Sequence, residues 1–276
     1  VRARKVALPA LLELHPGARA SLLRISELAT EEDRFLDGAA AASLEHAEID
    51  QGPLGFLTRN DEILLRRSVL AALPMVLRRR AVRLAARALG GNLDAEASSS
   101  VAEALSSESG GSWTCEGGTP ILEWQRDKLH CFTFGERETF RHPLQVPGET
   151  AADVFGWKFE TYECPPEEFR REPASLDVVI DGGSTKGPLS FRTLESGDSF
   201  EPLGAPGTRK ANDMASEAGL SRIARSRVPV VCDLAGIVWM PGVAIAHRVR
   251  ITETSRSGLR LVFGPLESKL RTTNRS

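Results

Sequence analysis

The sequence has few cysteines, and their spacing excludes the usual metal and disulfide frameworks. No two of the four cysteines form a C-x-x-C pair, and no histidine stands at metal-ligand spacing from them. Small disulfide-built domains of secreted proteins carry cysteines at a far higher density. We therefore expect reduced, partly buried thiols in a cytosolic protein at Cys115, Cys131, Cys164 and Cys232.

Long apolar runs are also missing. No stretch of about 18 apolar residues occurs, so the sequence predicts no membrane span. The opening VRARKVALPALLEL has no continuous apolar core and no small-residue cleavage site, which argues against a signal peptide. Because the first residue is Val rather than Met, we expect a fragment of a longer, cytoplasmic protein.

Neither sign of charge is in excess. The 276 residues carry 35 Lys and Arg against 37 Asp and Glu, a formal net charge of −2. This balance argues against a protein that coats nucleic acid over its whole surface, although it permits a local basic patch. The length suits about two domains.

Apolar periodicity predicts helices in the first part of the chain. Residues 1–48 carry apolar side chains at helical steps, interrupted by Pro16-Gly17, and the acids that follow Thr30 allow a kink there. A short strand-like piece is expected over 54–57. Another helical region is expected over 61–89, with a break at Pro74.

The second half of this helical region is two-sided. One stripe is apolar: Leu73, Leu77, Ala81, Leu84 and Ala88. The opposite side is basic: Arg79, Arg80, Arg83 and Arg87. Seven arginines and no acid occur between Ile63 and Leu93, whereas a surface helix normally mixes both signs. Two interpretations stay open, a solvated face that aids solubility and a face that meets phosphates.

Strand patterns dominate from Trp113 onward. Apolar or alternating runs predict strands over 121–124, 129–134, 144–146, 154–163, 176–180 and 189–194, with one short helix near 212–218. The Gly-rich pieces SGGS (109–112) and GGSTK (182–186) lack the residues and spacing of phosphate loops, so we expect turns there. The predicted class is α+β: a helical first domain followed by a β-rich α/β C-terminal domain.

The segment 200–250 carries the densest functional pattern. A Gly/Pro-rich loop holds Arg209 and Lys210, and a second basic cluster follows. Two apolar strands joined by a turn at Asp233 to Gly236, and a last pair of arginines, complete the segment. Cations in such loops suit phosphate contacts, because the backbone approaches closely and adds N–H donors. No acid–base pair or metal cluster is visible in the sequence. We expect binding rather than catalysis here, with plain solvation of the cluster as the alternative.

This segment resembles the C-terminal domain of tRNA(Ile)-lysidine synthetases. The family patterns G-D-R-F-x-P-L-G, G-x-R-K-L-K-D, V-P-R-x-x-R-D-x-x-P-V-V and G-x-x-W-V-P-G-x-R-I-D-x-R correspond to GDSFEPLG, GTRKAND, LSRIARSRVPVV and GIVWMPGVAIAHR between 197 and 248. Order and spacing hold over about fifty residues. The opening R-x-R and L-P-x-L-L, and the helix with Arg79-Arg80, resemble earlier parts of the family pattern. The departures are Ser199, Ala211, Asn212, Ser226 and Ala246.

The resemblance implies a tRNA-binding region in three parts: a helical domain over 1–110, β-rich hairpins over 111–186 and a C-terminal domain over 187–276. The tRNA-binding residues it implies are Arg79, Arg80, Arg83, Arg192, Arg209, Lys210, Arg222, Arg225, Arg227 and Arg248. Asp198 and Asp213 are expected to orient arginines or cap turns, and Trp239 to lie in the core. No catalytic residue and no metal ligand is expected.

The family's chemistry belongs to an N-terminal ATP-pyrophosphatase-like domain with an S-G-G-x-D-S motif, which this sequence lacks. There ATP, with Mg²⁺, adenylates the wobble cytidine of an isoleucine tRNA (CAU anticodon), and lysine displaces AMP. The resemblance therefore implies that this chain alone is inactive and needs no cofactor of its own. Its implied partners are the acceptor stem and body of isoleucine tRNA and the catalytic domain, and a homodimer is allowed. The alternative is a protein-interaction module that docks a partner domain.

Overall fold

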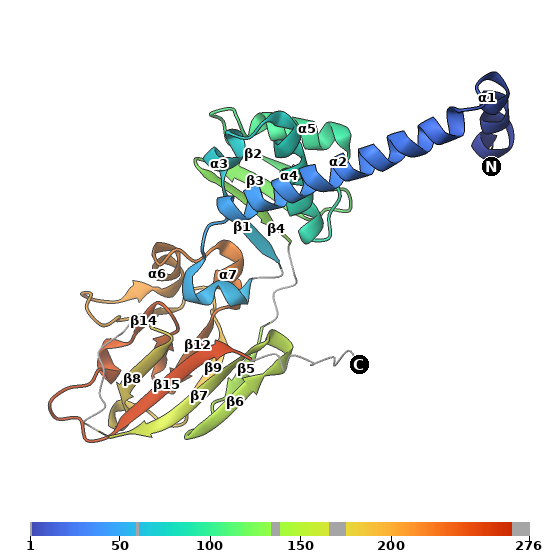
Figure 1. Ribbon diagram of the computed structural model, residues 1–276. Coiled ribbons are helices and arrows are strands. Elements are labelled where there is room, and N and C mark those ends of the chain that lie inside the picture. Colours follow the sequence, from blue (N-terminus) through green and yellow to red (C-terminus); the bar gives the residue numbers. More distant parts are fainter. Residues whose placement is uncertain (1, 59–60, 134–138, 166–174, 267–276) are drawn as a thin grey trace, which may run out of the picture. The chain divides into compact units, whose positions relative to one another are not determined.

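The computed structural model describes residues 2–58, 61–133, 139–165 and 175–266, and the chain divides into two compact units. The first unit comprises residues 1–49 and 62–133, and the second comprises residues 50–61 and 134–276. The chain thus contributes a short early segment to the second unit before it returns to the first. Helices dominate the early chain and strands the later chain (Figure 1), which confirms the predicted α+β class.

The first unit combines helices with a four-stranded antiparallel sheet of order β1-β4-β3-β2. Its helices are η1 (Ala3–Ala7), α1 (Leu8–Leu14), α2 (Ala18–Ala47), α3 (Arg67–Ala71), α4 (Met75–Ala88) and α5 (Ala95–Ala104). Its strands are β1 (Glu62–Arg66), β2 (Gly111–Thr114), β3 (Ile121–Gln125) and β4 (Lys128–Phe132). Figure 1 shows the first half of α2 extending away from α3, α4, α5 and the sheet of this unit, with α1 at its outer end.

Two of the local predictions are wrong, and the kink allowed near Thr30 does not begin a new helix. Residues 62–66 form the strand β1 rather than a helix, because they pair with β4 from Glu62↔Phe132 onward. The segment expected to be strand-like at 54–57 lies instead in a 3₁₀ helix, η2 (Gly52–Leu57). No new helix begins at Thr30, whose hydroxyl donates to the Ser26 carbonyl inside the continuous α2. The predicted breaks after α1 and before α4 are confirmed.

The buried face of α4 also differs from the predicted leucine stripe. The buried residues are Arg78, Ala81, Val82, Ala85 and Ala86, whereas Ala88 is exposed and the leucines of the stripe are half-buried. Small side chains on this face let α2 pack closely, and Ala40 and Ala47 of α2 are fully buried as well. Periodicity therefore identified the helix but placed its buried side incorrectly.

The second unit contains two larger sheets and a hairpin. The sheet orders are β14-β13-β12-β9-β5 and β6-β7-β15-β8, and β10 pairs with β11. The strands are β5 (Arg141–Pro143), β6 (Gly148–Ala152), β7 (Trp157–Cys164), β8 (Asp177–Asp181), β9 (Ser190–Thr193), β10 (Ser199–Phe200), β11 (Arg209–Lys210), β12 (Pro229–Asp233), β13 (Gly236–Met240), β14 (Ala244–Ile245) and β15 (Gly258–Pro265). The helices are η2, η3 (Asp153–Phe155), η5 (Gly182–Ser184), α6 (Ala211–Glu217), α7 (Arg222–Arg227) and η6 (His247–Val249). The short helix predicted near 212–218 is α6, but α7 was not predicted.

One aromatic core joins the two larger sheets of the second unit. The Phe159 ring of β7 lies 4.9 Å from Phe263 of β15 and 5.2 Å from Phe191 of β9, measured between ring centroids. The early segment belongs to this core, since Leu54 and Leu57 are buried in it. Trp239 is fully buried here, as predicted. All four cysteines are buried thiols.

None of the helices that the structure describes is both long and apolar enough to cross a membrane.

Candidate nucleic-acid interface

The first two cations of the basic segment lie on the hairpin strand β11, directly before α6. Arg209 forms an ion pair of 2.5 Å with Glu217 at the end of α6, and both side chains are more than a third exposed. Such an exposed pair contributes little to stability and is easily exchanged for another anion. The exposed Lys210 side chain has no hydrogen bond or ion pair within the described chain, and Asp213 lies exposed in the first turn of α6.

The second basic cluster is the helix α7. Ser221 caps it, because its hydroxyl accepts a 3.0 Å hydrogen bond from the Ala224 amide. Arg225 and Arg227 lie in its last turn, where positive charge suits the helix dipole. Arg227 donates to the Leu57 carbonyl (3.0 Å) and to the Asp61 carboxylate (2.5 Å). Arg227 therefore anchors the early segment, whereas Arg222 is exposed and Arg225 is half-buried.

Arg192 is buried and holds a turn. It donates two 2.7 Å hydrogen bonds to the Asp198 carboxylate and one of 2.9 Å to the Thr193 carbonyl, and only 7% of it is exposed. Asp198 also accepts from the Glu195 amide at 2.7 Å. Burial by itself would raise the pKa of Asp198, but these hydrogen bonds and the Arg192 charge outweigh it and lower that pKa.

Arg248 has a similar arrangement with Asp233. Its two terminal nitrogens lie 2.7 and 2.8 Å from the Asp233 carboxylate, whose side chain has no exposed surface. Asp233 also accepts from the amides of Lys186 and Ala235, which fixes the predicted turn between β12 and β13. Burial would raise the pKa of Asp233, but the hydrogen bonds from Arg248 and from the two amides lower it.

These two carboxylates give a pH prediction. When folding lowers the pKa of an aspartate, the ionised carboxylate stabilises the fold. This stabilisation is complete above the ordinary aspartate pKa of about 3.9, and it is lost as pH falls through the pKa of the folded state. The difference in free energy of unfolding between the wild type and Asp198→Asn is therefore expected to be large near neutral pH and to shrink below about pH 4. Urea denaturation over a pH series measures it, with the exposed Asp213→Asn as control. A difference that stays constant down to about pH 2 would contradict the assignment.

In the first unit, two arginines of the acid-free stretch between Ile63 and Leu93 have structural roles. Arg67 and Arg78 are nearly buried and donate to the carbonyl groups at which neighbouring helices end. The Arg67 guanidinium lies 2.9 Å from the Leu105 carbonyl, and that of Arg78 lies 3.1 Å from the Ala102 carbonyl. A buried carbonyl without a donor is costly, so these positions need a cation. Part of the arginine excess in the sequence therefore serves the fold.

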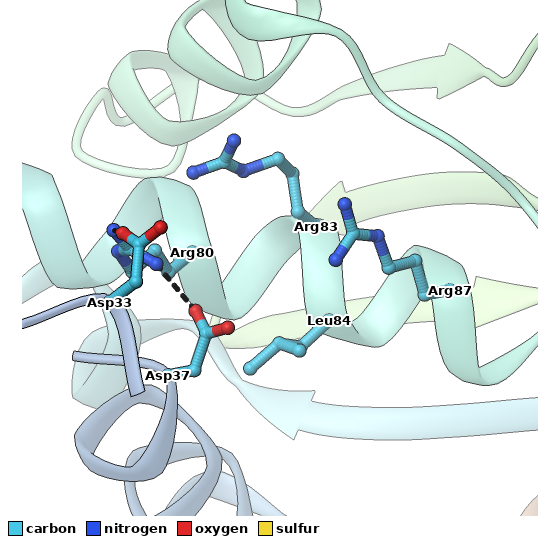
Figure 2. A pocket seen from close by; sticks show the side chains of 6 residues that line it. All are labelled: Asp33, Asp37, Arg80, Arg83, Leu84 and Arg87. Carbon is cyan, nitrogen blue, oxygen red and sulfur yellow. Dashed lines mark hydrogen bonds and ion pairs between the residues drawn. The ribbon is translucent and has the colours of Figure 1, made fainter. Parts of the chain in front are cut away.

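The predicted phosphate face of α4 contains arginines in different environments. Arg80 pairs with both Asp33 and Asp37 of α2, the latter at 2.6 Å (Figure 2). Arg79 makes one long contact of 3.5 Å to the Ser99 hydroxyl. Arg83 is half-buried, and no hydrogen bond or ion pair of its side chain is found within the described chain.

Sequence reasoning missed the acidic partners. Asp61 lies 166 positions before Arg227, and no local pattern connects them. A signal for Arg80 was present, because Asp33 and Asp37 are four residues apart and therefore share one side of a helix. Among the described residues, no group of three or more His, Cys, Asp or Glu side chains is placed to hold a metal ion.

The similarity of this chain to known proteins includes the basic segment described above. Residues 189–262 match the family model described as the TilS substrate C-terminal domain. The tRNA(Ile)-lysidine synthase of Symbiobacterium thermophilum is 28% identical over 271 residues, which are 94% of this chain and 56% of that protein. The protein of the same name from Bacillus subtilis is 28% identical over 257 residues, 87% of this chain and 51% of its own length. The chain is related to the tRNA(Ile)-lysidine synthases.

The resemblance predicted from the motifs is thus confirmed. The chain spans about half the length of the lysidine synthases named above. A third, from Parabacteroides distasonis, is 37% identical over 96 residues, 35% of this chain and 22% of that protein. A crystal structure described as the TILS C-terminal domain aligns with a TM-score of 0.43 at 24% identity, over 48% of this chain and all of that one.

The matched lysidine synthase domain contains most of the predicted site. Arg192, the cations from Arg209 to Arg227, and Arg248 lie within residues 189–262, together with Asp198 and Asp213. The arginines of α4 lie outside this match, in the first unit.

Proposed function

We propose that this chain is the tRNA-binding and tRNA-selecting portion of a tRNA(Ile)-lysidine synthase. The observation that carries this proposal is the similarity to lysidine synthases along 94% of the chain, which includes the C-terminal domain match. The names of these relatives describe a lysidine synthase acting on an isoleucine tRNA. The tRNA is therefore the partner that we propose for the basic surfaces of this chain.

The geometry of the second unit suits contact with RNA phosphates. Lys210, Arg222 and Arg225 present positive charge from β11 and α7, which pack on a buried core. Arg192 and Arg248 act differently in this proposal, since their guanidinium groups are engaged by carboxylates and hold the turns nearby. A rigid set of cations suits an A-form stem, which proteins recognise mainly through shape, phosphates and 2′-hydroxyls.

The chemistry would lie in the part of the lysidine synthases that this chain does not span. In this proposal ATP and Mg²⁺ act in an ATP-pyrophosphatase-like domain, which activates the wobble cytidine for attack by lysine. This chain would hold and select the tRNA, and it would not ligate lysine by itself. Its predicted division at residues 110 and 186 remains a proposal.

Removing Lys210 and Arg225 of the second unit is expected to weaken the salt dependence of tRNA binding. Each lost phosphate contact should lower the slope of log K against log salt by about 0.9, so Lys210→Ala with Arg225→Ala should lower it by nearly 2. Filter binding or fluorescence anisotropy at several salt concentrations measures the slope.

The control is Arg19→Ala with Arg24→Ala, which removes the same charge from exposed positions on α2. An equal slope in both double variants would reject the site. Absence of tRNA binding by the wild-type chain at low salt would reject the function itself.

A second function, docking of a protein domain, is favoured by one observation. Leu22, Leu23, Ile25, Leu28 and Phe35 on the extended half of α2 are each between 47% and 75% exposed. Exposed apolar patches of this kind mark interaction surfaces. The lysidine synthases are about twice as long as the stretch they share with this chain, so we propose their catalytic portion as the occupant. Such binding should survive high salt and be lost in Ile25→Asp with Leu28→Asp.

A further inference from the structure

A pocket between α2 and α4 gathers charged side chains from both helices of the first unit. It has a volume of about 200 Å³ and is lined by Asp33, Asp37, Arg80, Arg83, Leu84 and Arg87. Figure 2 shows the carboxylates coming from one helix and the guanidinium groups from the other. Residues four apart on a helix share a side, which explains why Asp33 with Asp37, and Arg83 with Arg87, reach the same pocket.

The carboxylates of this pocket are directed at one arginine. Arg80 receives both of them, and its side chain is only 16% exposed. The hydrogen bond from Arg80 to Asp33, followed by the one to Asp37, raises the pKa of the Arg80 guanidinium. Arg80 therefore fastens α2 to α4, and its positive charge is already compensated by two carboxylates.

Arg83 and Arg87 are left without a counter-charge. Neither side chain has a hydrogen bond or ion pair within the described chain, although they lie one helical turn apart. Like charges at this spacing repel each other, and an anion bound between the two guanidinium groups would remove this repulsion. With three guanidinium groups and two carboxylates, the pocket keeps one net positive charge.

We propose that this pocket is a phosphate-binding site in which Arg83 and Arg87 bind the phosphate. In this proposal Asp33 and Asp37 hold Arg80 as a link between the two helices, and their negative charge limits the affinity for phosphate. Guanidinium groups bind phosphate oxygens in bidentate geometry, and the half-buried Leu84 side chain excludes water from one side. The phosphate could belong to an RNA backbone or to a free nucleotide. The choice of RNA rests on the proposed function, whereas the site itself does not.

The proposal assigns different effects to neighbouring charges. Arg83→Gln with Arg87→Gln is expected to lower the salt slope of tRNA binding by about 1 to 2, as expected for one or two lost phosphate contacts. Arg19→Gln with Arg24→Gln is the matched control, because it also removes two charges, from exposed positions on α2 outside the pocket. Asp33→Asn with Asp37→Asn should tighten binding severalfold at low salt, since it removes two negative charges and frees Arg80. This gain should vanish at high salt.

Two arms of the experiment separate the site from its source of phosphate. Pyrophosphate and ATP are titrated into the full chain while the side-chain ¹⁵N signals of Arg83 and Arg87 are followed by NMR. Shifts of these signals, absent for Arg19 and Arg24, support the site even if tRNA does not bind, an outcome that would reject only the proposed function. The site is overturned if neither phosphate nor tRNA moves these signals. Where tRNA binds, RNA is rejected as the source of the phosphate if the double glutamine variant, with unchanged thermal unfolding, matches the Arg19 and Arg24 control in tRNA binding.

Discussion

Arg78→Ala is expected to lower the free energy of unfolding of the first unit by about 3 kcal/mol or more, whereas Arg79→Ala should change it by less than about 0.5 kcal/mol. Arg78 is 8% exposed and donates to the carbonyl groups of Leu70, Ala102 and Leu73 at 2.9 to 3.1 Å. It also contacts the Ala71 carbonyl and the Ser106 hydroxyl. Each buried acceptor that loses its donor costs about 1 to 3 kcal/mol, although water entering the site offsets part of this.

The two substitutions lie at neighbouring positions of the chain, and both remove one positive charge. Urea denaturation followed by tryptophan fluorescence reports on this unit through Trp113 and Trp124. Arg78→Lys should fall between the wild type and the alanine variant, because one ammonium group cannot reach acceptors that surround a planar guanidinium. Equal destabilisation by Arg78→Ala and Arg79→Ala would show that burial does not separate the roles of these two arginines.

Arg248→Ala is expected to destabilise the second unit by about 2 to 4 kcal/mol. The reason is the Asp233 carboxylate, which has no exposed surface and would keep two backbone amide donors but lose its cation. Removing one partner of a buried pair costs more than the pair itself contributes, because a charge is left unpaired. About a third of the Arg248 side chain is exposed, so rehydration keeps the cost below that of a fully buried pair.

A double-mutant cycle tests this role. Adding Asp233→Asn to Arg248→Ala should recover part of the lost stability, since no unpaired carboxylate remains. The salt slope of tRNA binding, measured where Arg248→Ala is still folded, should stay close to that of the wild type. A slope lowered by about 1 with unchanged stability would instead make Arg248 a phosphate contact.

Local signals predicted much of the fold. Helical periodicity identified α1, α2 and α4, and the breaks at Pro16-Gly17 and Pro74 lie where helices end and begin. The turn from Asp233 to Gly236 was also predicted, and Gly236 adopts a φ of 118° there, which favours glycine. These features depend on residues within a few positions of one another, which a sequence displays directly.

The candidate site was predicted less completely. The sequence pointed to a cationic segment and to its resemblance to lysidine synthases, but it could not rank the cations. Arg192 and Arg248 are held by buried or half-buried carboxylates, and Arg227 anchors the early segment. Lys210 and Arg225 carry no such partner in the described chain. Burial and pairing separate these roles, and neither can be read from residue type.

The sequence by itself determined the α+β class, the family relationship and the location of positive charge along the chain. Only the tertiary structure decided that residues 62–66 form a strand, that η2 belongs to the second unit, and which arginines face a carboxylate. The physical reason is distance along the chain: β1 pairs with a strand some 66 positions later, and Arg227 meets Asp61 across 166. Helix and turn preferences act between near neighbours, whereas strand pairing and ion pairing depend on which distant segments share a core.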